Sequence, residues 1–351
     1  MFSTYKPKDV TILLKDISGL VKPQPTQERE RLIQSGKHYS EMLPVEYEPS
    51  PEYLKTYYDA LKRFSNITAD AVANVSNSIY SDKGKKVVLV SLARAGTSIG
   101  ILIKHYIEQK FHCEVQHYTI SIIRGIGIDK NAMNYILSRH GSETLQFVDG
   151  WTGKGAIQNQ LFESKNFFPN VDFNLAVLSD PAHIAEKFGT REDFLIASSC
   201  LNSTISGLLS RTFLRGDIIG KNDFHGAAFY SDLKENDLTY QFINSVESKF
   251  DFSKLPPQFK ISERDNSGLD EVHKIAEEFQ ISDINLIKPS IGETTRVLLR
   301  RVPWKILVRS LNDEKNLGHL YQLAKEKKVE VIEYPLKNYK ACGLIRSLKD
   351  V

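Results

Sequence analysis

The stretch 86-KVVLVSLARAGTSIGILIKHYIEQ-109 decides the fold class of this chain. Residues 86–92 are an almost continuous apolar run rich in valine, which predicts a buried strand. The small residues of 93–97 predict a tight turn, and residues 98–109 have the apolar spacing of an amphipathic helix. A buried strand that turns directly into a helix is the repeating unit of parallel α/β sheets.

The same alternation continues on the C-terminal side of this stretch. Further strands are predicted at 114–123, 145–149, 173–178 and 194–199, with helices at 130–139 and 155–164. Strands that alternate with helices predict an α/β fold with a doubly wound, mostly parallel sheet.

Proline content and charge divide the chain into four parts. Residues 1–50 contain five prolines and are expected to form an irregular leader that wraps the domain after it, residues 51–252, which starts with one or two helices over 51–80. A linker is predicted at 253–267. Residues 268–351 are expected to form a second, smaller α/β/α domain that ends in a short helix.

Composition excludes several classes of protein. The chain has 351 residues, a formal net charge of +3 and three cysteines, Cys113, Cys200 and Cys342, so it is neither a general polyanion binder nor a disulfide scaffold. No apolar run is long enough to span a membrane, and the N-terminus lacks a hydrophobic signal core. We therefore expect a cytoplasmic protein without a membrane partner.

Two strand ends carry residues suited to phosphate. Small residues let the backbone approach an anion, turn N–H groups and a helix N-terminus can bind it, and an arginine supplies a fork of donors. Asp149 can accept from ribose hydroxyls or hold Mg²⁺ through water. The alternative is that both turns are ordinary strand-to-helix connections. The candidate phosphate-binding residues are Ala93, Arg94, Ala95, Gly96, Thr97, Asp149, Gly150, Thr152, Gly153, Lys154 and Gly155.

These motifs also carry a family resemblance. LARAGT (92–97) resembles the pyrophosphate loop of type I phosphoribosyltransferases, and FVDGWTGKG (147–155) resembles their loop for phosphoribosyl pyrophosphate (PRPP). Together with SIIRGIGID (121–129), they are similar to the StiP family of phosphoribosyltransferase-like proteins from bacterial tellurite-resistance (Ter) stress operons. That family is expected to combine a phosphoribosyltransferase-type domain with a C-terminal Pelota-like RNA-binding domain.

The resemblance implies an enzymatic function. It implies a Mg²⁺-dependent enzyme that transfers from PRPP, or a related ribose phosphate, to a base-like acceptor, with Asp149 and Arg124 as catalytic residues and Asp149 as the metal ligand. It also implies partners among the products of neighbouring stress-operon genes. The sequence departs from the pattern at two places, because Gly150 replaces a second acid and Gly155-Ala156 replaces a final threonine.

Two other functions stay open. One is a nucleotide-sensing, RNA-binding regulator with a degenerate transferase site. The other is a cysteine hydrolase or protease, in line with the protease label of the family, in which Cys200 and His225 form a nucleophile–base dyad. The segment after the sheet is the candidate acceptor pocket in the transferase interpretation, and helix capping is its alternative role. Its residues are Cys200, Asn202, Ser203, Thr204 and His225.

Positive charge is concentrated in the last quarter of the chain. Residues 288–309 contain six basic residues and one acid, Glu293. Such a run is commonly a solvated helix face. Residues 287–296, however, resemble the segment by which Pelota-type and kink-turn-binding ribosomal domains meet RNA. The resemblance implies an RNA partner, contacted by Lys288, Gly292, Glu293, Arg296, Arg300, Arg301 and Lys305.

Overall fold

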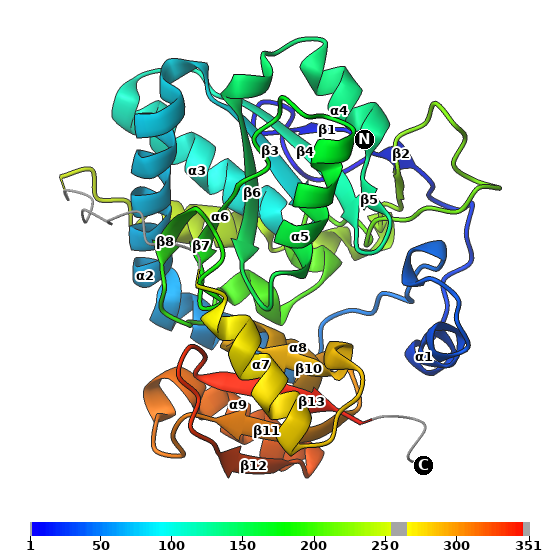
Figure 1. Cartoon of the computed structure of the whole chain (residues 1–351), viewed down its shortest axis with the longest axis vertical. Coiled ribbons are helices and arrows are strands. Elements are labelled where there is room, and N and C mark those ends of the chain that lie inside the picture. Colours follow the sequence, from blue (N-terminus) through cyan, green and yellow to red (C-terminus); the bar gives the residue numbers. More distant parts are fainter. Residues whose placement is uncertain (1, 254–264, 347–351) are drawn as a thin grey trace.

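The computed structural model describes residues 2–253 and 265–346, and these fold into two α/β units that lie one against the other (Figure 1). The predicted linker at 253–267 lies mostly outside the described residues. No helix of the described part is long and apolar enough to cross a membrane.

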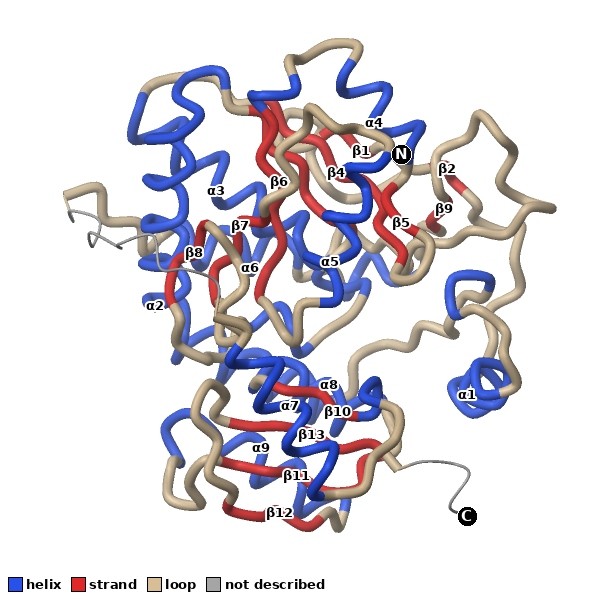
Figure 2. Tube along the Cα trace, in the orientation of Figure 1, coloured by secondary structure: helices blue, strands red, loops and turns tan. Residues whose placement is uncertain are grey.

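The N-terminal unit is built on a mostly parallel sheet, which confirms the predicted α/β class. Its strands run parallel in the order β1-β4-β3-β6-β7-β8, and a short β5 pairs antiparallel with β4 (Figure 2). The strands are β1 (Thr11–Ile12), β3 (Val88–Ala93), β4 (Gln116–Ile123), β5 (Gly127–Ile128), β6 (Leu145–Trp151), β7 (Leu175–Ser179) and β8 (Lys187–Thr190).

Helices cover both faces of this sheet. Alternate strand residues face opposite sides, so Leu89 belongs to the apolar cluster that includes α2 and α3, while Val88 and Val90 belong to the cluster that includes α4 and α5. The predicted helical region at 51–80 is one 33-residue helix. The helices are α2 (Pro51–Lys83), α3 (Ala95–Phe111), α4 (Lys130–Leu137), α5 (Ala156–Glu163) and α6 (Thr239–Glu247).

The leader is more ordered than its prolines suggested. Its strand β1 extends the sheet by pairing with β4, and β2 (Lys15–Asp16) pairs with β9 (Gly226–Ala227) from the end of the unit. A short helix, α1 (Thr26–Gln34), follows to one side of the sheet (Figure 1). The leader therefore joins the N-terminal unit through backbone pairing.

One predicted strand of the N-terminal unit is wrong. Residues 194–199 do not form a strand, because β8 ends at Thr190 and the chain then enters a 3₁₀ turn at Ala197–Cys200. The run Phe194–Ile196 is apolar because it is buried in the cluster that includes α2. A short buried run of this kind cannot be distinguished from a strand by its pattern alone.

The C-terminal unit is a four-stranded mixed sheet with the order β10-β13-β11-β12. Its last strand, β13, replaces the predicted terminal helix and lies inside the sheet, antiparallel to both neighbours; residues 347–351 lie outside the described part. The elements are α7 (Ser267–Glu278), β10 (Ile287–Pro289), α8 (Ile291–Arg300), β11 (Pro303–Val308), α9 (Glu314–Lys327), β12 (Glu330–Glu333) and β13 (Ala341–Ile345).

A buried carboxylate joins the two units. Asp193, which follows β8, accepts hydrogen bonds from the backbone N–H groups of Ile291 (3.0 Å) and Lys340 (2.8 Å). The first of these groups is at the N-terminus of α8. Leu298 and Leu299 of α8 belong to the same apolar cluster as α2 and α3, so the core is continuous across the junction.

Candidate functional site

Two cavities lie at the junction of the units. The first, cavity 1, has a volume of about 460 Å³ and is lined by the leader, the segment after the sheet and α8. The second, cavity 2, has a volume of about 520 Å³ and is lined by the turn after β6, the start of β10 and α8. Both volumes are typical of ligand sites. The predicted phosphate-binding and RNA-binding residues therefore meet at one place.

Asp149 lines cavity 2 at the end of β6. Its carboxylate accepts a hydrogen bond from the Gly150 N–H (2.8 Å). Burial raises the pKa of Asp149 to about 6, with the Gly150 N–H and the positive charge of Arg296 acting in the opposite direction. A carboxyl group in this environment holds its proton more tightly than an exposed one.

Two side chains that follow Asp149, those of Thr152 and Lys154, form hydrogen bonds to other segments of the chain. Thr152 Oγ1 donates to Asp180 Oδ1 (2.5 Å), and Lys154 Nζ donates to the Ile287 carbonyl (3.1 Å) and to that of Ile284 in the C-terminal unit. Burial lowers the pKa of Lys154 to about 7, and Lys288 lowers it further. Thr152, Gly153, Lys154 and Gly155 all line cavity 2.

The predicted pyrophosphate loop has mainly packing roles. Arg94 points into cavity 1, where its guanidinium donates to Asn202 Oδ1 (2.9 Å) and the Leu209 carbonyl (3.0 Å). Thr97 is buried and shares a hydrogen bond with Thr119 (2.8 Å). Ala95 lines cavity 2, but neither Gly96 nor Thr97 lines either cavity. The connection is shorter than the predicted turn, because β3 ends at Ala93 and α3 begins at Ala95. The side chains of Arg94, Ala95 and Thr97 lie in three different environments.

Gly96 allows α3 to start directly against β6. A Cβ atom at this position would lie 2.6 Å from the Val148 carbonyl oxygen, a backbone atom that cannot move aside. We therefore expect Gly96→Ala to lower the free energy of unfolding by about 1–3 kcal/mol. Urea denaturation measures this, with Gly153→Ala as the control, because no atom of the described residues would lie within 4 Å of a Cβ there. Equal stabilities for the two variants would contradict the packing role.

The Mg²⁺ site at Asp149 stays a prediction, because Mg²⁺ is commonly held by one or two carboxylates, with waters and substrate phosphates completing its octahedral shell. The described ranges contain no group of three His, Cys, Asp or Glu residues able to hold a metal. Asp149 has a raised pKa, and Arg296 is among the groups that influence it. No step of the chemistry below uses a metal.

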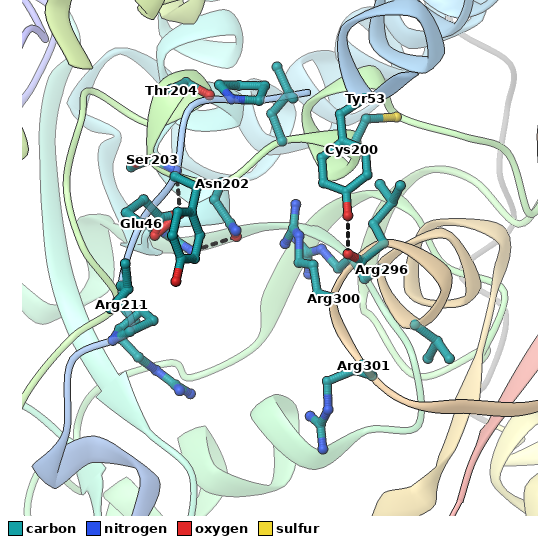
Figure 3. Close-up of a pocket in the computed structure, with 18 of the residues that line it drawn as sticks. Glu46, Tyr53, Cys200, Asn202, Ser203, Thr204, Arg211, Arg296, Arg300 and Arg301 are labelled. Atoms are coloured by element: carbon teal, nitrogen blue, oxygen red, sulfur yellow. Dashed lines mark hydrogen bonds between the residues drawn. The ribbon is translucent and has the colours of Figure 1, made fainter. Parts of the chain in front are cut away.

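Cys200 lies in the wall of cavity 1, at the end of the 3₁₀ turn. Asn202, Ser203 and Thr204 line the same cavity, so four of the five predicted pocket residues are brought together (Figure 3). Burial raises the pKa of the Cys200 thiol to about 12, while the positive charges of Arg300 and Arg296 lower it. The Arg300 guanidinium donates to the Ser199 carbonyl at 3.2 Å, directly beside the cysteine.

The fifth predicted residue, His225, lies elsewhere. Its Nδ1 shares a hydrogen bond with Ser121 Oγ (2.9 Å), and its backbone N–H donates to Asp129 (2.6 Å). His225 directly precedes β9, whose pairing with β2 fixes this stretch beside the leader strand. The Cys200–His225 dyad is therefore not formed, and none of the described residues lining cavity 1 is a histidine.

The predicted RNA-contact residues lie on the side of the C-terminal unit that faces the N-terminal unit. The alternative for this basic run was a helix face exposed to solvent. Gly292 packs near Ser199 and Trp151. Lys305 is the exception, because it forms an ion pair with Glu330 on the neighbouring strand and lines neither cavity. The residues that line the cavities are Lys288, Glu293, Arg296, Arg300 and Arg301, and Arg124 joins them by donating to Asn285 (2.9 Å).

Arg211 and Asp193 are among the site residues that no motif of the sequence singled out. Arg211 lines both cavities and stacks on Tyr39, with its guanidinium carbon 4.6 Å from the ring centroid. Asp193 holds the start of α8. Each is a single charged residue in an irregular segment, and no spacing relates it to the motifs. Only the apolar residues around Asp193 hinted that this acid is buried.

The fold and these cavities define a two-domain α/β protein with a cysteine in an arginine-rich cavity between the domains. Residues 3–247 match the family described as "Tellurite-like stress resistance cysteine protease StiP". Residues 266–347 match the PELOTA RNA binding domain. The Cysteine protease StiP of Acinetobacter baylyi is 38% identical over 367 residues, covering 98% of this chain and 94% of that protein. The chain belongs to the StiP family, as the motifs indicated.

These matches correct the main functional prediction. The family and the Acinetobacter relative are named cysteine proteases. These names overturn the prediction of a phosphoribosyltransferase activity and agree with the alternative prediction of a cysteine hydrolase. A hypoxanthine-guanine phosphoribosyltransferase from Bacillus anthracis is similar with 15% identity and a TM-score of 0.26, covering 34% of this chain and 70% of the enzyme. A second structure of that enzyme has 14% sequence identity to this chain and a TM-score of 0.26. Likeness at this level carries no argument about activity.

Proposed function

We propose that this chain is a cysteine-dependent hydrolase of peptide bonds, with Cys200 as its nucleophile, and that its C-terminal domain binds RNA. One observation carries the assignment of the nucleophile. Cys200 lines cavity 1, whereas Cys342 is buried within the C-terminal sheet and Cys113 lies between α3 and β4, outside both cavities. The protease names of the family and of the relative support the reaction class.

The reaction needs the thiolate of Cys200. The thiolate attacks the peptide carbonyl, the C–N bond breaks as the amine leaves with a proton, and water then hydrolyses the thioester to a free acid. Arg296 and Arg300 favour the thiolate by their charge, a role that a protonated histidine has in other cysteine enzymes. Glu46 and Glu293 line the same cavity and are the proposed acceptors of the thiol proton.

Burial opposes this activation. Cys200 has no exposed surface, and a peptide has to reach its sulfur atom. Helix α8 covers the turn that carries Cys200, because Arg300 bonds to Ser199 and Tyr53 donates to the Leu299 carbonyl of the same helix. We therefore propose that the hydrolase works after a small, local shift of α8, which lets water reach the thiol and lowers its pKa while Arg296 and Arg300 stay beside it.

A peptide with an electrophilic carbon at the scissile position tests the nucleophile. After incubation with the full chain, mass spectrometry is expected to find the adduct on Cys200. The rate of adduct formation is expected to rise with pH between pH 7 and 9, because the thiolate fraction rises as the pH approaches the pKa of the thiol. An adduct confined to Cys113, or a rate independent of pH, would contradict the proposal.

We also propose, at the level of fold, that the N-terminal unit is a doubly wound sheet of the type I phosphoribosyltransferase kind. The parallel strand order, the helices on both faces and the Gly-rich turn after β6 support it.

A further inference from the structure

The two cavities form one continuous site, which we name the interdomain trough. Cavities 1 and 2 share six lining residues, two from the N-terminal unit and four from the C-terminal unit. The trough therefore has a wall from each domain, and Figure 3 shows arginines from both walls directed into cavity 1. The shared residues are Arg29, Arg211, Lys288, Glu293, Arg296 and Arg301.

The trough concentrates positive charge on half-buried arginines. Burial lowers the pKa of Arg300 to about 9, and the charges of Arg296 and Arg94 lower it further. Burial also lowers the pKa of Arg211 to about 10, and two other arginines, Arg29 and Arg94, add to that effect. Half-buried cations that repel one another are stabilised when an anion enters, so the trough is suited to a ligand with several negative charges.

Unpartnered polar atoms point to the same conclusion. Ser203 is fully buried and lines cavity 1, yet its Oγ has no hydrogen-bond partner among the described residues. Arg296 Nε is likewise buried with no partner in the described part of the chain, although its Nη1 is paired with Glu293 (3.0 Å). Buried polar groups normally find a partner. Donors left free in a cationic site are suited to phosphate or hydroxyl oxygens.

Aromatic rings lie between these cations. Arg296 is stacked on Trp151, with its guanidinium carbon 4.5 Å from the ring centroid. Tyr39 and Trp151 line cavity 2, and Tyr53 and the exposed Tyr47 line cavity 1. Cations that follow a backbone, with aromatic rings for the bases, are typical of sites for single-stranded nucleic acid. The match of residues 266–347 to an RNA-binding domain favours RNA over an acidic peptide.

We propose that single-stranded RNA binds along the interdomain trough, held by cations of both domains, and thereby excludes a peptide from Cys200. This inference rests on the RNA binding proposed above and adds where the RNA lies, which N-terminal residues hold it and what it does to the hydrolase. Competition follows from position, because Cys200 and Arg211 line the same cavity.

Binding of a fluorescein-labelled 12-nucleotide single-stranded RNA to the full chain, followed by fluorescence anisotropy, tests the location. Arg211→Ala is expected to weaken binding at least about fivefold and to reduce the slope of log K against log salt by about one. Arg211→Lys, which keeps the charge, is expected to restore most of the affinity and shows that the effect is not misfolding. The matched control is Arg139→Ala, an exposed arginine that stacks on Tyr135 and lines neither cavity, and it is expected to change affinity less than twofold.

Competition tests the consequence. Saturating RNA is expected to slow the reaction of the electrophilic peptide with Cys200 at least tenfold. Poly-glutamate and duplex RNA are expected to displace the labelled RNA at least tenfold less well than unlabelled single strands. Equal displacement by poly-glutamate would overturn RNA as the ligand, and equal displacement by the duplex would overturn the single strand.

Different results would contradict the RNA-binding function and the position of the RNA in the trough. If the wild-type chain binds no RNA, the proposed RNA-binding function itself is wrong. If it binds RNA but Arg211→Ala and Arg139→Ala bind alike, the C-terminal domain binds RNA elsewhere and the trough is not the site. The anisotropy measurement does not depend on hydrolase activity, so an inactive nucleophile leaves it unaffected.

Discussion

Replacing Cys200 by serine is expected to reduce the rate of peptide hydrolysis by roughly 10³-fold or more, because loss of a catalytic nucleophile has effects of this order. A serine hydroxyl is far less acidic than a thiol, so the carboxylates of Glu46 and Glu293 are much too weak as bases to ionise it. The substitution preserves shape, so the buried turn at Ala197–Cys200 is expected to keep its packing. Turnover of a fluorogenic peptide by purified full chain measures the effect.

The matched control is Cys113→Ser. Cys113 is half-buried and lies outside both cavities, so this variant is expected to keep the wild-type turnover within about twofold. If Cys200→Ser keeps more than a tenth of the activity, the nucleophile is another residue. Circular dichroism of both variants separates loss of chemistry from loss of fold.

Removing the carboxylate at Asp193 is expected to lower the free energy of unfolding by about 2–4 kcal/mol, because two buried backbone N–H groups, of Ile291 and Lys340, lose their acceptor. Since Asp193 holds the start of α8, the Asp193→Ala variant is also expected to expose Cys200 to iodoacetamide more readily. Urea denaturation and alkylation of the native protein measure the two effects. Asp217→Ala, at an exposed ion pair with Arg215, is the control and is expected to change neither.

The same carboxyl group makes stability depend on pH. Burial raises the pKa of Asp193 to about 6 from its ordinary value of 3.8, so the folded chain binds more protons than the unfolded chain between these values. Its contribution to stability therefore falls as pH rises from about 4 to about 6 and is constant above that. The side chain of the Asp193→Asn variant cannot ionise, so its stability is expected to vary less with pH between about 4 and about 6. Asp149, whose pKa is also raised to about 6, is expected to cause the pH dependence that remains. An unchanged profile would mean that Asp193 is not buried as described.

The sequence predicted those helices and strands whose local residue pattern is enough to specify them. Strand β3 and helix α3 carry an unambiguous apolar spacing, and the Gly-rich turn after β6 was visible in the sequence. Strand β1 has two residues, Thr11 and Ile12, and exists only because β4 offers it an edge far along the chain. Strand β13 contains a cysteine and a glycine, and its central place in the sheet compensates for a weak strand propensity.

The candidate site was predictable in composition and not in arrangement. The cations of α8 were recognised, but an amphipathic pattern does not reveal whether a polar face meets solvent or another domain. Cys200 was singled out, while its proximity to Arg300 arises from the docking of the C-terminal unit. His225 was placed beside it on residue type alone, whereas strand pairing at β9 decides its position.

The apolar cluster that crosses the junction has a consequence for how the molecule unfolds. Leu298 and Leu299 share their core with Val72 and Ile99 of the N-terminal unit, so neither unit can lose its structure without exposing apolar surface of the other. We therefore expect the chain to unfold as one cooperative unit rather than as two tethered modules. Displacement of α8 from the Cys200 turn has to be a small, local excursion within that body, far less costly than separation of the domains.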